Sequence, residues 1–342
     1  MDRIGRTRPG YGPGPLSAGT EDIMNTIRTL MDVFHVRGLG RAALTATVIG
    51  FAMVTAAAAQ QSFKTPQEAA ETLVSAVRAG DRKAVDAILG PGAEQIISSG
   101  DAVQDENARK VFLASYDVKH SVQTSGDKPA TLLVGPDDYP FAIPITKKGD
   151  SWMFDAAAGL VEVLARRIGR NELAAIQVCL AYYDAQYEYA ETMPKVDDMA
   201  VYAQRVVSRP GKKDGLYWPS AEGQPQSPLG GAVAAASVRG YRVGSGEPYN
   251  GYYYKILTRQ GSKAPGGAHN FIVDGKMIGG FALIAWPAEY GNSGITTFLI
   301  SHDGAVYEKD LGKDTAKIAS RTTAFNPDDT WKKAVIDTAQ NK

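Results

Sequence analysis

Cysteine and histidine are scarce in this 342-residue chain, which contains one cysteine, Cys179, and four histidines. A single cysteine excludes an intrachain disulfide and the cysteine-rich zinc and iron–sulfur sites. No two histidines have the i, i+4 spacing that a helical metal site uses. They are His35, His120, His269 and His302. The sequence therefore predicts neither a metal nor a cofactor.

The chain has no excess of charge of either sign, because 37 basic residues balance 37 acidic ones. This balance gives no overall electrostatic indication of binding to nucleic acid or to an anionic membrane surface. Hydrophobic residues make up 44% of the chain and charged residues 22%, which is ordinary for a globular protein. The length predicts two domains, since single cores stop growing near roughly 250 residues.

Motifs of common enzymes are also missing. There is no GxSxG, no phosphate-binding Walker loop and no dinucleotide fingerprint. Residues 291–294 (GNSG) are one residue short of the first pattern and are typical of a turn. Asp197 and Asp198 lack the alternating oxygen ligands of a calcium loop. We therefore expect a protein that is not an enzyme.

Residues 41–59 have the order of a secretory signal peptide: basic residues, an apolar run, and the small residues 56–59. Cleavage is expected after Ala59, which would place the mature protein in the periplasm or outside the cell. The alternative is a retained anchor, since about 17 apolar residues is the lower limit for a membrane span. Residues 1–40, rich in Gly and Pro, are expected to be a disordered leader or to lie upstream of the true start, at Met24 or Met31.

Residues 63–156 show helical signals first and strand signals afterwards. Thr65 and Pro66 begin a helix that has Glu68 three residues after its cap. Strands are expected at 130–134, 141–145 and 152–154, with a turn at 148–150. This order resembles the cystatin-like or NTF2-like α+β cone. His120 and Asp155 could line a pocket of such a cone, although we favour a surface strand residue and a helix cap.

Residues 157–342 begin with a long helix, expected over 157–191 with a break near Gly169. An apolar stripe runs along it, with Cys179 beside the stripe as a small buried hydrophobe. The stripe consists of Leu173, Ile176, Leu180, Tyr183 and Tyr187. Short strands follow at 252–257, 271–273, 280–286, 296–300 and 305–308, and a helix is expected at 330–340. This region is therefore a second α+β domain.

Aromatic residues in glycine-rich surroundings are the candidate site. They suggest a surface for a partner or ligand, and the alternative is a sheet core. The residues are Tyr217, Trp218, Tyr252, Tyr253, Trp286 and Tyr290. Tyr252 and Tyr254 should share one strand face and Tyr253 the other.

Two family resemblances rest on longer blocks of sequence. The blocks RNELAAIQVCLAYYDAQYEYA, SRPGKKDGLYWP, NGYYYKILTRQG and GKMIGGFALIAWPAEYGNSGITTF occur in this order. They resemble the bacterial exported family catalogued as domain of unknown function 2950, which implies no particular activity. The C-terminal half is similar to the globular part of type IV pilins and pseudopilins. It differs from them because Glu162, Arg166 and Arg167 interrupt the apolar helix that pilins need for assembly.

Our leading hypothesis from the sequence is a non-enzymatic interaction or scaffold protein of the cell envelope. Its partner would be an envelope protein or a second copy of the chain, bound through the C-terminal domain. The alternative is a periplasmic enzyme or small-ligand binder that uses a pocket in the N-terminal cone or the C-terminal loops. A deep pocket with converging ionisable side chains would favour the alternative.

Overall fold

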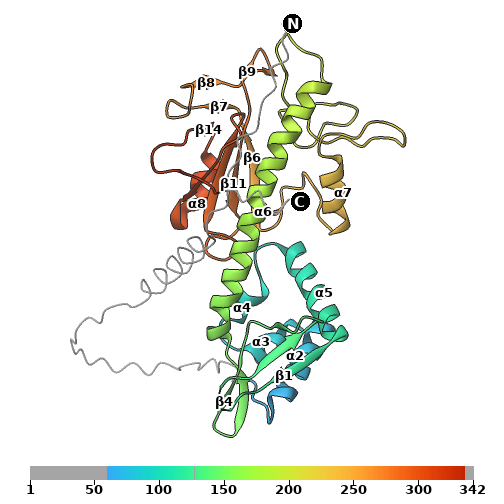
Figure 1. Cartoon of the computed structure of the whole chain (residues 1–342), viewed down its shortest axis with the longest axis vertical. Coiled ribbons are helices and arrows are strands. Elements are labelled where there is room, and N and C mark those ends of the chain that lie inside the picture. Colours follow the sequence, from blue (N-terminus) through green and yellow to red (C-terminus); the bar gives the residue numbers. More distant parts are fainter. Residues whose placement is uncertain (1–59, 127, 336–342) are drawn as a thin grey trace, which may run out of the picture. The chain divides into compact units, whose positions relative to one another are not determined.

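The computed structural model describes residues 60–126 and 128–335, which belong to one compact unit. The predicted leader and signal peptide lie outside these residues. None of the helices within the described ranges has the length and apolar character needed to span a membrane. The architecture is α+β, with helices and several antiparallel sheets, and two separate hydrophobic cores occur along the chain (Figure 1).

The N-terminal region places four helices before five strands. The helices are α2 (Pro66–Ala79), α3 (Arg82–Leu89), α4 (Ala93–Ile97) and α5 (Ala102–Val118). The strands are β1 (His120–Gln123), β2 (Thr131–Val134), β3 (Tyr139–Pro140), β4 (Ile145–Lys148) and β5 (Ser151–Phe154). Thr65 caps α2 as predicted, because its side chain accepts a hydrogen bond from the backbone nitrogen of Glu68 at 3.1 Å.

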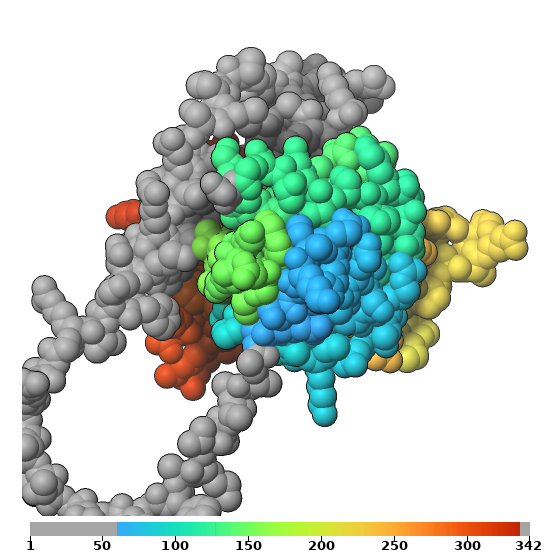
Figure 2. All heavy atoms as spheres, turned by 90° about the horizontal axis from the view of Figure 1, so that it is seen from below, coloured from blue at the N-terminus to red at the C-terminus, as the bar shows by residue number. Residues whose placement is uncertain are grey.

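Antiparallel pairing links these strands. β1, β2 and β3 form one sheet and β4 and β5 form a hairpin, with a bridge between Ala130 and Ile145 linking the two. Phe63 pairs with Trp152, and Figure 2 shows the first described residues, in blue, beside the light green segment near residue 150. The strand predicted at 141–145 is wrong over most of its length. Pro140 precedes that segment and Pro144 lies within it, and neither can donate a backbone hydrogen bond to a ladder.

A single helix, α6 (Ala156–Thr192), connects the two cores. The break predicted near Gly169 is absent, because α6 continues through that position. The predicted apolar stripe is also displaced: Leu173 is 64% exposed, whereas Ala175 and Cys179 are fully buried. The buried face also carries Tyr182, Gln186 and Tyr189, so it combines small and large side chains.

The C-terminal sheet has five antiparallel strands in the order β15-β13-β12-β11-β6. Its strands are β6 (Tyr252–Leu257), β11 (Ala282–Pro287), β12 (Thr296–Ser301), β13 (Val306–Asp310) and β15 (Lys332–Lys333). Smaller strands are β7 (Arg259–Gln260), β8 (His269–Asn270), β9 (Ile272–Val273), β10 (Lys276–Met277) and β14 (Ala324–Phe325). The helix α6 packs against β11, β12 and β13, and α8 (Thr315–Arg321) packs against β11 (Figure 1).

Several elements differ from the sequence prediction. The helices α7 (Gly230–Val238) and α8 and the 3-10 turn η1 (Gly312–Asp314) were not predicted. The helix predicted at 330–340 is wrong where the structure describes it, because Lys332 and Lys333 pair with β13 instead. Residues 336–340 of that prediction lie outside the described residues.

Candidate functional site

A cavity of about 830 Å³ lies in the N-terminal region, between the helices α2 to α6 and the segment from β2 to residue 143. Most of its lining is apolar. Side chains from separate elements converge on it, among them Leu73, Val85, Ile97, Phe112, Phe141 and Val163. Ligand pockets in proteins usually enclose about 300–1,000 Å³ and are lined in this way.

The helix α5 forms one wall of the cavity and is poorly buried. Only Tyr116 of its 17 residues is buried, although the helix also carries Val111 and Phe112. Val111 lines the cavity and is 66% exposed, so the wall reaches the molecular surface there. An apolar face of this kind gains stability when a partner covers it, by about 25 cal/mol per Å².

Five arginines line the same cavity, against two carboxylates, Asp105 and Glu106. They are Arg82, Arg109, Arg166, Arg167 and Arg170. Burying cations beside an apolar surface is costly unless they are paired or reach solvent. The lining itself therefore carries more positive than negative charge.

Three of these arginines already have carboxylate partners. Arg82 pairs with Asp86 and Glu94, and Arg109 pairs with Glu106 at 2.6 Å. The hydrogen bond from Arg109 lowers the pKa of Glu106, so this carboxylate stays ionised. Arg166 pairs in turn with Glu162 on the same helix, at 2.6 Å.

Arg167 and Arg170 are the two arginines without a carboxylate contact. Arg167 is only 7% exposed, and burial lowers its pKa. The negative charges of Asp105 and Glu289 oppose this shift, and the like charge of Arg170 adds to it. Arg170 is exposed, and among the described residues it makes no hydrogen bond or ion pair. The two residues are three apart on α6 and therefore lie on one face of the helix. An anion bound beside them would relieve their mutual repulsion.

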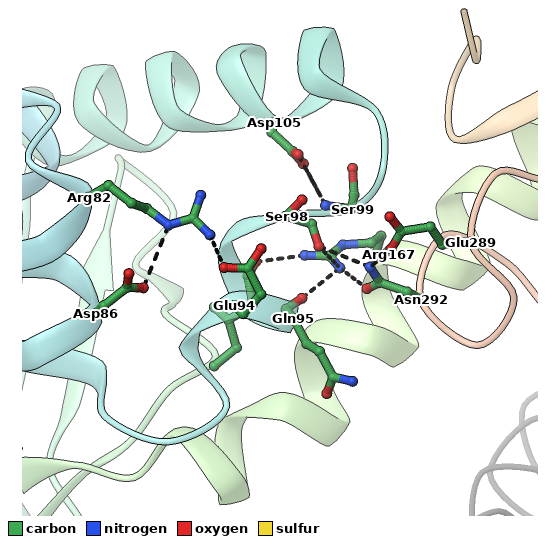
Figure 3. A network of polar contacts seen from close by, with 11 residues as sticks. Arg82, Asp86, Glu94, Gln95, Ser98, Ser99, Asp105, Arg167, Glu289 and Asn292 are labelled. Carbon is green, nitrogen blue, oxygen red and sulfur yellow. Dashed lines mark hydrogen bonds and ion pairs between the residues drawn. The ribbon is translucent and has the colours of Figure 1, made fainter. Parts of the chain in front are cut away.

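Arg167 binds backbone oxygens rather than an acid (Figure 3). Its guanidinium donates to the carbonyl oxygens of Gln95 at 2.8 Å and Ile96 at 2.6 Å, which stand at the end of α4. It also donates to the side-chain oxygen of Asn292, and Asn292 donates to the carbonyl of Ser98 at 3.0 Å. This cavity residue therefore connects α4 and α6 to the turn at residues 289–293.

Gln104 makes a second connection of the same kind. Its amide nitrogen donates to the side-chain oxygen of Asn171 at 2.8 Å, and Asn171 donates to the carbonyl of Ser293 at 2.9 Å. The amide oxygen of Gln104 is buried without a hydrogen-bond partner in the described structure.

Little in the sequence indicates this site. There, Arg166 and Arg167 stand out only as an interruption of a pilin-like helix, and nothing marks Arg170. Their spacing of one, three and four residues along a helix was the available signal, since it places the three cations on adjoining faces. His120 and Asp155 are not part of the cavity lining: His120 is exposed and stacks on Tyr116, and Asp155 caps α6.

The six aromatic candidates lie in separate places. Tyr253 and Trp286 pair across β6 and β11, with ring centroids 5.7 Å apart, and both are half-buried. Tyr252 is fully buried against Phe298 in the core and offers no surface. As predicted, Tyr252 and Tyr253 lie on opposite faces of β6. Tyr252 points toward α6, and Tyr253 points away from it.

The other three candidates have local partners. Trp218 packs edge-on against Tyr189 of α6, with centroids 6.4 Å apart, next to Tyr217. Tyr290 donates a hydrogen bond to Asp310 at 3.1 Å, and burial raises its pKa to about 12. The structure thus brings together Tyr253 and Trp286, and it does not unite the six residues in one surface.

Comparison with known proteins gives one match. A family model described as "Protein of unknown function (DUF2950)" matches residues 60–334. No curated protein and no solved structure is significantly similar to the chain. No group of three or more histidine, cysteine, aspartate or glutamate residues in the described ranges is arranged to hold a metal ion.

Proposed function

The chain belongs to the DUF2950 family, and on this premise we propose that its N-terminal cavity binds a small amphipathic anion without converting it. The observation that carries the proposal is the 830 Å³ apolar cavity beside Arg167 and Arg170. This favours the ligand-binding alternative over a purely structural role. It is consistent with the cone-like arrangement expected for residues 63–156, in which helices close over a curved sheet.

The apolar lining selects the tail of the ligand. A cavity of 830 Å³ has the volume of roughly 25 to 30 water molecules, which is room for a single acyl chain. Each methylene group transferred from water to such a lining contributes about 0.8 kcal/mol. A chain of ten to fourteen carbons would lie along α5 and cover the exposed flank of Val111.

The arginines select the head group. A guanidinium presents several donors in a planar fork that matches carboxylate and phosphate oxygens. Arg170 has its donors free, and Arg167 lies one turn away on the same helix. Catalysis would need an acid or base with a matched pKa, whereas the pKa of Glu106 is lowered by Arg109. The proposal is therefore binding alone.

The test is a calorimetric titration of the full chain with dodecanoate. We expect saturable binding to one site, and about tenfold weaker binding for Arg170→Gln. Val111→Asp should weaken binding to a similar degree, because it places a negative charge on the cavity wall. Dodecyltrimethylammonium, which has the same tail and a positive head, should bind much more weakly.

Val118→Asp is the matched control, since Val118 is 70% exposed on the same helix and does not line the cavity. It should bind dodecanoate like the unsubstituted protein. The proposal fails if dodecanoate shows no saturable binding. It also fails if Arg170→Gln and Val111→Asp bind as tightly as the control.

We also propose that the protein acts in the periplasm or outside the cell after removal of a signal peptide at residues 41–59. The family match supports this location, because it begins at residue 60, directly after the expected cleavage site. N-terminal sequencing of the protein from cells should give Gln60 as the first residue. A mature protein that retains residues 41–59 would contradict the proposal and would indicate an anchor.

An interaction role for a pilin-like domain at residues 157–342 is a second candidate, favoured by the half-buried pair of Tyr253 and Trp286. Paired aromatic rings with one side open are enriched at protein interfaces. Native mass spectrometry and pull-down from envelope extract should then return a dimer or a constant partner, which Tyr253→Ser weakens. A monomeric mass with no reproducible partner would count against this role.

A further inference from the structure

A second cavity, of about 250 Å³, lies in the C-terminal region where the end of α6 meets residues 201–214 and the turn between β9 and β10. It shares no residue with the N-terminal cavity. Tyr189 and Tyr202 supply aromatic walls, and charged side chains occupy much of the remaining lining. Its size and polarity differ from those of the first cavity, so it calls for a different ligand.

Three cations and one carboxylate line this pocket. The cations are Arg205, Arg209 and Lys276, and the carboxylate is Asp214. Asp214 accepts two hydrogen bonds from Arg209, one from its backbone nitrogen at 2.9 Å and one from its Nε at 2.6 Å. These bonds lower the pKa of Asp214, so it stays ionised and positions Arg209.

One carboxylate leaves an excess of two positive charges in the lining. Arg205 lies 3.9 Å from Asp214, at the limit of an ion pair, and Lys276 has no ion pair or side-chain hydrogen bond among the described residues. Cations held near one another in a concave site raise the local concentration of anions. The net charge therefore fits a ligand with two negative charges.

The walls of the pocket are held in place before any ligand arrives. The hydroxyl of Tyr189 donates to the carbonyl of Lys213 at 2.8 Å, and the amide of Gln204 donates to the carbonyl of Gly275 at 2.8 Å. The backbone nitrogen of Tyr202 donates to the carbonyl oxygen of Met277 at 2.8 Å. A preformed site binds more tightly because it loses less conformational entropy on binding.

We propose that this pocket binds a compact free dicarboxylate of about four to six carbons. The volume of 250 Å³ corresponds to roughly eight water molecules, which matches eight to ten non-hydrogen atoms. Arg205, Arg209 and Lys276 bind the two carboxylates, and Tyr189 and Tyr202 contact the carbon chain between them. This assignment is independent of the amphiphile site, because neither set of residues contributes to the other.

Calorimetric titration of the full chain with succinate tests the assignment, with succinamide as the neutral analogue of equal size. We expect saturable succinate binding, and at least about tenfold weaker binding of succinamide. The double variant Arg205→Gln/Lys276→Gln should bind succinate roughly 100-fold more weakly. Raising the ionic strength should weaken binding to the unsubstituted protein.

Lys212→Gln is the matched control, because Lys212 is exposed in the same loop and does not line the pocket. It should bind succinate within about twofold of the unsubstituted protein. Thermal unfolding without ligand shows whether the double variant folds, and Lys276→Gln alone replaces it if it does not. The proposal is overturned if succinate does not bind saturably, if succinamide binds equally well, or if a folded variant keeps full affinity. Binding of acidic peptides but not of succinate would also overturn it.

Discussion

The carboxylate of Asp101 accepts a hydrogen bond from the backbone nitrogen of Gly251, 150 residues further along the chain, at 2.9 Å. The same oxygen accepts a second bond from the hydroxyl of Tyr241 at 3.0 Å. The other carboxylate oxygen caps α5 through the backbone nitrogen of Gln104. One buried side chain therefore joins the exposed wall of the amphiphile cavity to the start of β6.

Asp101→Ala should lower the free energy of unfolding by about 3 kcal/mol. The loss combines a helix cap, worth about 1 kcal/mol, with two buried hydrogen bonds to a charged group. Asp81→Ala is the control, because Asp81 caps α3 at an exposed position through Ala84 at 3.0 Å. It should cost only about 1 kcal/mol. Urea denaturation measures both, and equal losses would show that the bonds to Gly251 and Tyr241 contribute nothing.

Gly251→Ala should be more destabilising than Gly246→Ala. Both glycines have positive φ angles, +76° and +83°, so an alanine at either position costs about 1 kcal/mol of backbone strain. At Gly251 a Cβ would also collide with the amide of Asn171, whereas the space around Gly246 is open. We expect a total of about 3 kcal/mol for Gly251→Ala. Matching unfolding midpoints for the two variants would contradict this close packing.

Arg167→Lys should destabilise the protein by about 2 kcal/mol even though the charge is kept. An ammonium group cannot reproduce the planar fork that reaches Gln95, Ile96 and Asn292, so buried carbonyl oxygens lose their donors. Arg170→Lys, one turn further along α6, should change stability by less than about 0.5 kcal/mol. Chemical denaturation compares them, and similar effects would argue against the role of the Arg167 network.

Cys179 should resist alkylation in the folded protein. Its thiol is fully buried, and burial raises its pKa to about 12, which lowers the thiolate fraction near neutral pH roughly 1000-fold. Iodoacetamide followed by mass spectrometry should label Cys179 only after addition of denaturant. Rapid labelling of the native protein would contradict its place in the core.

The same raised pKa predicts an effect of pH on stability. The folded protein favours the neutral thiol, so this contribution is complete below about pH 9 and is lost as the pH rises toward about 12. Cys179→Ala removes the titrating group and should flatten part of that alkaline decrease. If the dependence of stability on pH is unchanged in Cys179→Ala, other groups cause the alkaline decrease in stability.

Sequence signals correctly predicted those elements that depend only on residues close together in the chain. The cap at Thr65 and the alternating aromatics of β6 each depend on a few neighbouring residues, and both were predicted within one residue. The prediction of which face of α6 is buried was wrong, because the size of the apolar side chains does not decide which side of a helix packs against a sheet. The close approach of β11 and β12 selects Ala175 and Cys179 over the larger Leu173.

The candidate site depends on contacts that the sequence does not display. The bond from Gly251 to Asp101 and the bond from Asn292 to Ser98 join residues 150 and 194 positions apart. The cavity lies between the helices α2 to α6 and the segment from β2 to residue 143, and no local pattern in α5 indicates empty space beside it. The sequence shows that the arginines of α6 are neighbours on a helix, but it does not show the cavity beside them.

Hydrogen–deuterium exchange of the full chain with and without dodecanoate tests the central claim most directly. If the N-terminal cavity holds the acyl chain, dodecanoate will slow exchange of the amides in α5, whose wall it would cover. The loops at residues 201–214 will keep their exchange rates. Saturating dodecanoate that leaves α5 unprotected, or that protects only the C-terminal region, would contradict the account.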